Sequence, residues 1–283
     1  MNDSSHWVLT LACPDRPGIV HAVTGAIATA QGNITELQQF SSTDSDTFFM
    51  RVQVQSGFER SAFEESLRPL AAYLHASWHL DEVGRPRRTL VLASKAAHCL
   101  NDLLFRQRAG QLPITVSRVM ANHPDLRGLA AFYGVPFSDH VVLPETKAAF
   151  EEEVARVIEE SDIEVVVLAR YMQILSPDLC EKLAGRAINI HHSFLPGFKG
   201  ANPYRQAHVR GVKLIGATAH FVTADLDEGP IIEQNVTRVD HTRTPAELAA
   251  IGRDQESVTL AAAVRLVAEH RVLLDGHRTV VFQ

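Results

Sequence analysis

The first eighty residues alternate short apolar runs with segments of helical period. An apolar run at 7–13 ends in the turn-forming cluster at 14–18 and predicts a buried strand. Further elements are predicted as a helix at 19–30, a hairpin of strands at 34–41 and 47–54, a second helix at 63–74 and a strand at 77–80. The order βαββαβ is that of a small ferredoxin-like α+β domain.

The pattern in the rest of the chain predicts an α/β domain. The charged segment DEVGRPRR at 81–88 has no apolar period, so we place domains at 1–83 and 89–283 with a linker at 84–88. Strands are predicted at 89–93, 114–120, 165–169, 187–191, 214–222 and 231–239, helices at 97–107, 146–160 and 245–270, and a terminal hairpin at 272–282. The run at 165–169 is apolar on both faces, which is typical of a mostly parallel, Rossmann-like sheet covered by helices.

Composition narrows the classes of protein. Hydrophobic residues make up 46% and charged residues 21% of the chain, which excludes a disordered protein. The formal net charge of -6 argues against general binding to nucleic acid, which needs clustered Lys and Arg. The 3 cysteines form no CxxC pair, as expected in the cytoplasm. We expect no signal peptide and no contact with membranes, because no apolar run approaches about 20 residues.

The segment AINIHHSFLPGFKGANPY at 187–204 is the most informative for chemistry. Asn189 and His191 lie two residues apart on a predicted strand, so an amide and an imidazole project from the same face toward one atom. A loop rich in Gly and Pro follows at the carboxyl end of this strand, where open α/β sheets bind ligands. The structural alternative is a core histidine and a strand-end cap.

A second segment, AHFVTADLDEGPII at 219–232, places acids after a strand that ends at His220. Asp225, Asp227 and Glu228 lie in one tight turn, which in most proteins is simply solvated. The functional alternative is that one carboxylate lies against the amide and the imidazole as a proton acceptor. Because the pKa of a free Asp is about 3.9, burial or the neighbouring acid would have to raise it.

Together these segments resemble the folate-dependent formyltransferase family, through motifs like NIHxSxLPxFxG and HFVxxxxDxGPII. The resemblance implies that the catalytic residues are Asn189, His191 and Asp227, the last directly before EGPII. The segment LARYMQIL at 168–175 resembles the part of the family that borders the pterin of 10-formyltetrahydrofolate. On this basis the residues assigned to the folate pocket are Met172, Gln173, Leu175, Gly197, His220 and Asp225.

Two departures from the transformylases of this family indicate one subgroup. The glycine-rich phosphate loop is absent, and ASKAAHCLNDLL at 93–104 resembles the formyltetrahydrofolate deformylases instead. In front, CPDRPGIV and GNITELQQ resemble an ACT domain, in agreement with the order βαββαβ. The resemblance implies hydrolysis of 10-formyltetrahydrofolate to tetrahydrofolate and formate in one-carbon metabolism, with a link to purine synthesis and no prosthetic group.

Other polar residues have both a functional and a structural interpretation. Ser94, Lys95 and His98 are candidates for the mouth of the site, although ordinary helix-start residues look the same. In ACT domains the corresponding regions form subunit interfaces or bind a small amino acid, so the candidates here for a homo-oligomer interface (dimer or tetramer) or an effector site are Asp15, Arg16, Gly18, Asn33 and Ile34. Turn chemistry alone also explains these residues, and we place oligomerisation ahead of effector binding.

Three alternatives stay open from the sequence. A metal site at His191, His192, His220 and Asp227 is disfavoured, because adjacent strand residues such as the first two point to opposite faces. Formyl transfer to an amine, such as a phosphorylated ribonucleotide, is the enzymatic alternative; a tRNA acceptor is disfavoured by the acidic balance and by the short segment after residue 270. The third is an amino-acid-sensing regulator with an inactive catalytic domain, which the complete set of site residues argues against.

Overall fold

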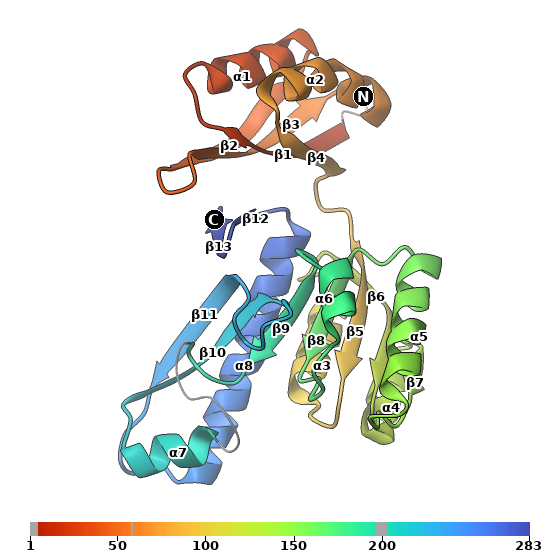
Figure 1. Cartoon of the computed structure of the whole chain (residues 1–283), viewed down its shortest axis with the longest axis vertical. Helices are drawn as coiled ribbons and strands as arrows, with labels where there is room; N and C mark the ends of the chain where they lie inside the picture. Colours follow the sequence, from red (N-terminus) through yellow and green to blue (C-terminus); the bar gives the residue numbers. More distant parts are fainter. Residues whose placement is uncertain (1–4, 58, 196–202) are drawn as a thin grey trace. The chain divides into compact units, whose positions relative to one another are not determined.

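The computed structural model describes residues 5–57, 59–195 and 203–283. The chain divides into two compact units (Figure 1): residues up to Arg85 together with Glu269–Gln283 form the first, and Pro86–Ala268 form the second. Among the described residues, none of the helices combines the length and apolarity that crossing a membrane requires.

The first unit is built on an antiparallel sheet of four strands in the order β2-β3-β1-β4. Its elements are β1 (Ser5–Pro14), α1 (Ile19–Thr29), β2 (Asn33–Ser42), β3 (Thr47–Ser56), α2 (Arg60–Leu74) and β4 (Ser77–Glu82). This element order and strand order are those of a ferredoxin-like domain, so the fold predicted from the sequence is confirmed.

The apolar period that predicts the first helix is also the face that the helix buries. Ile19, Val23 and Ile27 recur every four residues and are 2%, 0% and 0% exposed. They share one core cluster with Leu9 and Leu11 of β1. Gly18 precedes the helix with φ of 92°, a left-handed conformation that favours glycine.

The opposite face of this sheet carries buried charged residues, and the C-terminal segment provides partners for them. Arg51 on β3 is only 2% exposed; its Nη1 donates to Glu36 Oε1 at 2.8 Å and its Nη2 to the carbonyl oxygen of Glu269 at 3.1 Å. Ser42 Oγ donates to Asp275 Oδ2 at 2.8 Å. The segment continues as a hairpin of β12 (Val272–Asp275) and β13 (Arg278–Val281). The sequence analysis assigned these residues to the second domain; the structure groups them with the first, because they provide partners for its buried charged groups.

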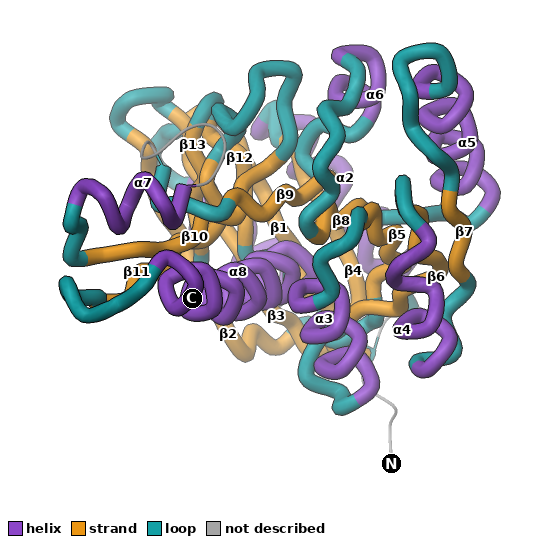
Figure 2. The backbone as a smooth tube through the Cα atoms, turned by 90° about the horizontal axis from the view of Figure 1, so that it is seen from below, coloured by secondary structure: helices purple, strands orange, loops and turns teal. Residues whose placement is uncertain are grey.

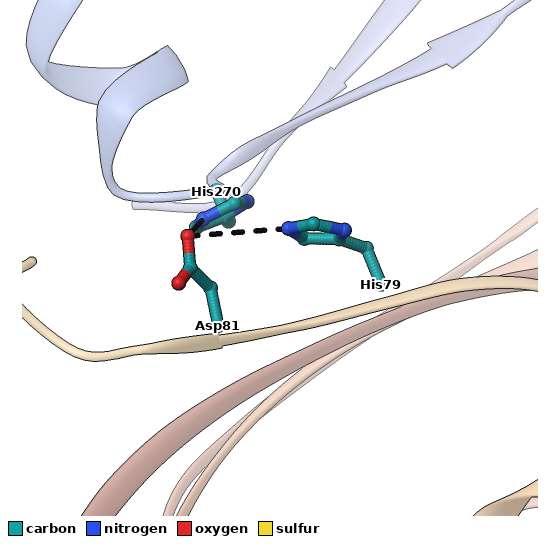
Figure 3. A group of neighbouring side chains, drawn as sticks. All are labelled: His79, Asp81 and His270. Carbon is teal, nitrogen blue, oxygen red and sulfur yellow. Dashed lines mark hydrogen bonds and ion pairs between the residues drawn. The ribbon is translucent and has the colours of Figure 1, made fainter. Parts of the chain in front are cut away.

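Asp81 on β4 also binds the C-terminal segment, through His270. Its Oδ2 accepts a hydrogen bond from His270 Nε2 at 2.9 Å and lies 4.0 Å from His79 Nε2 (Figure 3). Arg85 donates to both carboxylate oxygens, at 2.7 and 2.6 Å. The three residues drawn in Figure 3 have the spacing of metal ligands, but the guanidinium already neutralises the only carboxylate. We therefore interpret the group as an ion-pair cluster that fixes the C-terminal segment.

Replacing Asp81 with Asn is expected to reduce the free energy of unfolding by roughly 3 kcal/mol at pH 7, because a buried charged partner of Arg85 is lost. Burial alone would raise the pKa of Asp81, but hydrogen bonds from His270, His79 and Arg85 hold it well below its usual range. The carboxylate therefore stabilises the fold above its unfolded pKa of about 3.9, and this contribution is lost as the pH falls below that value. Urea unfolding of both proteins at pH 7 and below pH 4 should show the difference shrinking in acid.

The control for this prediction is Asp44→Asn. Asp44 pairs with Arg278 at 2.6 Å, but its side chain is 70% exposed. An exposed ion pair contributes little to stability because water screens it, so this variant should unfold almost as the unmodified protein does. If both variants lost the same free energy of unfolding, burial of Asp81 would not explain the stability that its contacts provide.

The second unit contains a sheet of seven strands in the order β11-β10-β9-β8-β5-β6-β7, parallel from β9 to β7 and antiparallel at β10 and β11. Its strands are β5 (Arg87–Ala93), β6 (Ile114–Ala121), β7 (Phe137–Asp139), β8 (Val165–Ala169), β9 (Ala187–His191), β10 (Leu214–Phe221) and β11 (Ile231–Arg238). Its α-helices are α3 (His98–Arg108), α4 (Arg127–Phe132), α5 (Lys147–Glu160), α6 (Pro177–Lys182), α7 (Pro203–Arg210) and α8 (Pro245–Ala268). The predicted mostly parallel α/β domain is confirmed.

Helices cover both faces of this sheet. Figure 2 shows α3, α4 and α8 on one face and α5 and α6 on the other. All five residues of β8 are buried, as its continuous apolar run predicts for a strand between two helical layers. Because β8 and β9 are parallel neighbours, their carboxyl ends lie at the same edge of the sheet, where ligands bind in such folds.

The connection between the units is shorter than the sequence indicates. β4 extends to Glu82 and β5 already begins at Arg87. Arg87 Nε lies 3.1 Å from Glu164 Oε1, and Arg88 Nε donates to the carbonyl oxygen of Asp162 at 2.8 Å. Two of the three arginines expected in the linker, Arg87 and Arg88, are thus strand residues, because the turn before β8 offers acceptors for both.

Candidate active site

Asn189 and His191 lie at the carboxyl end of β9, next to the antiparallel strand β10. Their spacing of two places both side chains on one face, and Asn189 is opposite His220 in the register of the two strands. A cavity of about 270 Å³ opens there, lined by the end of β9, by residues 170–175 after β8 and by residues 222–227 after β10. Two segments far apart in sequence therefore close around the amide and the imidazole.

Asp227 brings the third polar group to this cavity. Its Oδ1 lies 3.1 Å from His191 Nδ1 and 3.7 Å from His220 Nε2. The His220 ring is fixed separately, because its Nδ1 donates to the carbonyl oxygen of Phe221 at 2.8 Å. Its Nε2 faces both the Asp227 carboxylate and the Asn189 amide, whose Nδ2 lies 3.2 Å away. The four side chains form one connected network.

The electrostatics of Asp227 differ from the expectation. Hydrogen bonds from His191 and His220 outweigh burial and hold the pKa of Asp227 well below its usual range. The raised pKa that a general base would need is therefore not found at Asp227, because both neighbouring imidazoles favour the charged carboxylate more strongly than burial opposes it. Asp227 is therefore ionised at neutral pH and presents a fixed negative charge beside His191.

The turn that carries Asp227 is tightly constrained. Asp227 has φ of 59°, in the left-handed region that a non-glycine residue seldom adopts. Two residues later, a Cβ on Gly229 would lie 1.7 Å from the carbonyl oxygen of Phe221. Glycine at this position lets the turn pass directly against the end of β10, which directs the carboxylate back toward His191. Strain of this kind is concentrated at functional sites.

The structure separates the candidates proposed from the sequence into three groups. Those that line the cavity beside the three central residues are Met172, Gln173, Leu175, His220 and Asp225. Ser94, Lys95 and His98 are not among the described residues that line it. Ser94 Oγ instead accepts a hydrogen bond from the backbone N–H of Met172 at 2.9 Å and so supports the lining segment, whereas Lys95 is exposed. Gly197 lies outside the described residues.

Two residues that the sequence analysis did not select, Arg170 and His192, also line the cavity. Arg170 directly follows β8, and a charged residue after an apolar strand was the available signal. His192 follows β9, and its ring stacks on His191 with centroids 4.7 Å apart. The expectation that these neighbouring histidines point to opposite faces is wrong, because the strand ends at His191 and its alternation stops there.

The candidate metal ligands of the sequence analysis form no metal-like group among the described residues. The groups with ligand spacing in that part of the chain are the cluster of Figure 3 and a second one at His98, Cys99 and Glu256, and neither contains His191 or Asp227. Arg170 Nε lies 3.3 Å from Glu256 Oε2 in the second group, so a cation already occupies the space beside that carboxylate.

The candidates in the first unit have structural roles. Arg16 Nη2 donates to the carbonyl oxygen of Tyr73 at 2.8 Å, and the Arg16 guanidinium lies 4.5 Å from the centre of the Tyr73 ring. The backbone N–H of Asp15 donates to the carbonyl oxygen of Asp46 at 2.8 Å. Asn33 and Ile34 begin β2 and pair with β3. Turn and strand chemistry accounts for these residues, and an interface or effector role stays a prediction.

Comparisons with known proteins agree with this architecture. The model of the formyl transferase family matches residues 87–264, and the model of the ACT domain matches residues 7–68. A relative named formyltetrahydrofolate deformylase, from Corynebacterium sp. (strain P-1), is 47% identical over 290 residues that cover 100% of both chains.

Solved structures extend the comparison. A formyltetrahydrofolate deformylase from Burkholderia mallei has a TM-score of 0.96 at 50% identity and covers 99% of this chain and 100% of its own. Glycinamide ribonucleotide transformylase 1 from Symbiobacterium toebii has a TM-score of 0.65 at 33% identity and covers 72% of this chain and 98% of its own. The similarity to the deformylase thus spans both units, whereas the transformylase covers a smaller part of the chain.

Proposed function

This chain belongs to the formyltetrahydrofolate deformylases, which hydrolyse 10-formyltetrahydrofolate to tetrahydrofolate and formate, and we propose that Asn189, His191 and Asp227 are its catalytic residues. The observation that supports this assignment is the contact of 3.1 Å between His191 Nδ1 and Asp227 Oδ1, beside the Asn189 amide and at one cavity. An amide donor, a proton carrier and a fixed negative charge are what formyl hydrolysis requires.

Each side chain has a distinct role in the proposed mechanism. The oxygen of a water molecule attacks the formyl carbon, and its proton passes to the coupled pair of Asp227 and His191. The Asn189 amide donates a hydrogen bond to the formyl oxygen, where negative charge develops in the tetrahedral intermediate. His191 then gives a proton to N10 as the bond between carbon and N10 breaks, releasing tetrahydrofolate and formic acid, which loses its remaining proton to solvent and leaves as formate. Because Asp227 is a weak base, we assign it mainly to orienting the water and stabilising the protonated imidazole.

The folate is proposed to bind along the segments that frame the cavity. Met172, Ile174 and Leu226 line it and are 60%, 58% and 58% exposed, which is unusual for large apolar side chains. An aromatic pterin or benzoyl group would cover this surface, while polar groups such as Gln173 and Asp225 would orient it.

The alternatives left open by the sequence are less well supported. Formyl transfer to an amine is the activity named for the transformylases, but the similarity over the full chain is to deformylases. An inactive regulator does not account for the complete hydrogen-bonded network.

For the ACT domain we propose a role in homo-oligomerisation or binding of a small amino acid. We also propose a cytoplasmic location, supported by bacterial relatives and by three free, buried cysteines.

Asn189→Ala tests the proposal directly. Removal of one donor to a developing oxyanion typically lowers turnover about 100-fold, so we expect a loss of that size in kcat with a small change in KM. Formate release from 10-formyltetrahydrofolate is the measurement. Asn101→Ala is a control for loss of an amide, because Asn101 is exposed on α3 and its Oδ1 accepts a 3.3 Å hydrogen bond from the Tyr133 hydroxyl. Equal rates in both variants would refute the role of Asn189.

A further inference from the structure

Next to His191 lies a chain of polar side chains that the proposed mechanism does not use. His192 follows β9, Arg170 follows β8 and Glu256 lies in the middle of α8. These residues are far apart in sequence, and Glu256 is 1% exposed. A buried carboxylate is costly unless it is paired, so its position near the site needs a reason.

The first link joins His192 to the catalytic imidazole. The two rings stack with centroids 4.7 Å apart and an angle of 23° between their planes. Arg170 Nη1 donates to His192 Nδ1 at 2.8 Å. Because a guanidinium can only donate, Nδ1 must accept, so a neutral His192 carries its proton on Nε2. Burial and the charges of Arg170 and His191 lower the pKa of His192 to about 4, in agreement with a neutral ring at physiological pH.

The second link holds Arg170 in place. Its backbone has φ of 61°, a left-handed conformation that turns the chain sharply at the end of β8. Its side chain reaches Glu256, with Nε 3.3 Å from Oε2. The carboxylate balances the guanidinium charge and orients the group that donates to His192.

The third link fixes Glu256 itself. His98 Nε2 lies 2.8 Å from Oε2, and the Tyr204 hydroxyl donates to Oε1 at 2.7 Å. Gly252 lies one turn earlier on α8, and a Cβ there would be 2.0 Å from the same hydroxyl oxygen. Glycine therefore leaves the space in which Tyr204 reaches the carboxylate. His98, which the sequence analysis placed at the mouth of the site, is instead a support of Glu256.

We propose that Glu256, acting through Arg170 and His192, positions the catalytic imidazole of His191. This inference rests on the proposed function of His191. Asp227 fixes the Nδ1 edge of His191, and the stacked ring of His192 fixes its plane, so two contacts in different directions define one orientation. Misplacement of a catalytic group by about 1 Å can lower a rate 100-fold, which is why a positioning contact is significant here.

The stacked ring must also be uncharged for this role. When His191 takes up a proton, a second positive charge 4.7 Å away would oppose it. The charged and titratable groups that act on His192 are Arg170 after β8, His191 on β9, Asp227 after β10 and Glu256 on α8. Among them, Arg170 occupies the nitrogen that would otherwise accept a proton. Its bond to His192 therefore sets both the orientation and the charge of the ring.

Two substitutions of His192 separate positioning from general stability. His192→Ala removes the ring and should lower kcat by about 30-fold to 100-fold with KM within about threefold. His192→Phe restores a flat ring against His191 but not the bond from Arg170, so kcat should recover only in part, to about tenfold below the unmodified enzyme, the loss also expected when Glu256 no longer holds Arg170. A raised KM with unchanged kcat in the Ala variant, or no recovery with Phe, would overturn the proposal.

Glu256→Gln tests the remote end of the chain without touching the cavity. We expect kcat to fall about tenfold with KM unchanged, because Arg170 loses its counter-ion. Thr259→Val is the matched control: Thr259 is fully buried on the same helix and accepts a hydrogen bond from Asn235 Nδ2 at 3.2 Å. It should lower stability but leave kcat unchanged. Equal kcat in the two variants would contradict the proposal.

Nitrogen-15 NMR of histidine-labelled enzyme provides a test that does not depend on any variant being active. His192 should be neutral with its proton on Nε2 from about pH 5 to 8, and the signal is assigned by its loss in His192→Phe. A ring protonated on Nδ1 would refute the bond to Arg170. If Asn189→Ala keeps full activity, the proposed function fails instead, whereas these NMR results concern the His192 assignment alone.

Discussion

Asp227→Asn is expected to lower the kcat of formate release by about 1,000-fold. The amide keeps the size of the carboxylate and tolerates the left-handed backbone at φ of 59°, so the turn should fold as before. It removes the negative charge 3.1 Å from His191 Nδ1, and with it the stabilisation of a protonated imidazole and the orientation of the attacking water. KM should change little, because the charge acts mainly in the transition state.

Glu228→Gln is the matched control, since Glu228 is the next residue of the same turn and is exposed. Its kcat should stay within about threefold of the unmodified enzyme. Hydrogen bonds from His191 and His220 hold the pKa of Asp227 well below its usual value, so the carboxylate is ionised throughout the neutral range. A loss of activity on mild acidification would therefore report the protonation of another group. A variant at Asp227 that retains a tenth of the activity would rule out its proposed role.

Local periodicity was sufficient for most of the fold. The strands β8 and β9 occupy the ranges that their apolar runs predict, 165–169 and 187–191. The elements missed by the sequence analysis are short, namely α4, α6, α7, β7 and a 3-10 helix at Pro124–Leu126. A segment of three to eight residues spans about two turns of helix or less, so its apolar period cannot be distinguished from that of a loop.

The C-terminal segment shows where local pattern is insufficient. The hairpin itself was predictable from two apolar runs around Asp275 and Gly276. Its assignment to a unit depended on Arg51 and Asp81, two charged residues inside strands that bury them. A charged residue in a buried strand indicates that a partner is needed, but the sequence does not predict where in the chain that partner lies. Only the folded structure supplies Glu269 and His270 as those partners.

The candidate site was predictable to a similar extent. The spacing of Asn189 and His191 on a strand and the acids after His220 were sufficient to select the segments that meet at the cavity. The direction of the pKa shift of Asp227 was not, because it depends on two imidazoles rather than on the neighbouring acid. Glu256 was also not predictable, since it lies in the middle of a long helix more than sixty residues after His192.

His191→Asn is expected to lower kcat by about 1,000-fold or more while the enzyme keeps its fold. The Asn amide can still donate to Asp227 from the position of Nδ1, but it cannot take up a proton and pass it to N10. A purely supporting role for His191 therefore predicts an active Asn variant, and a role in proton transfer predicts an inactive one.

Comparison with His191→Ala makes this distinction quantitative. The Ala variant loses both the donor to Asp227 and the proton carrier, yet its kcat should be close to that of the Asn variant, because proton transfer is the larger effect and losses within one catalytic unit are not additive. Circular dichroism and thermal unfolding establish that both variants are folded. A kcat for His191→Asn within about tenfold of the unmodified enzyme, alongside an inactive Ala variant, would show that His191 serves only to hold Asp227.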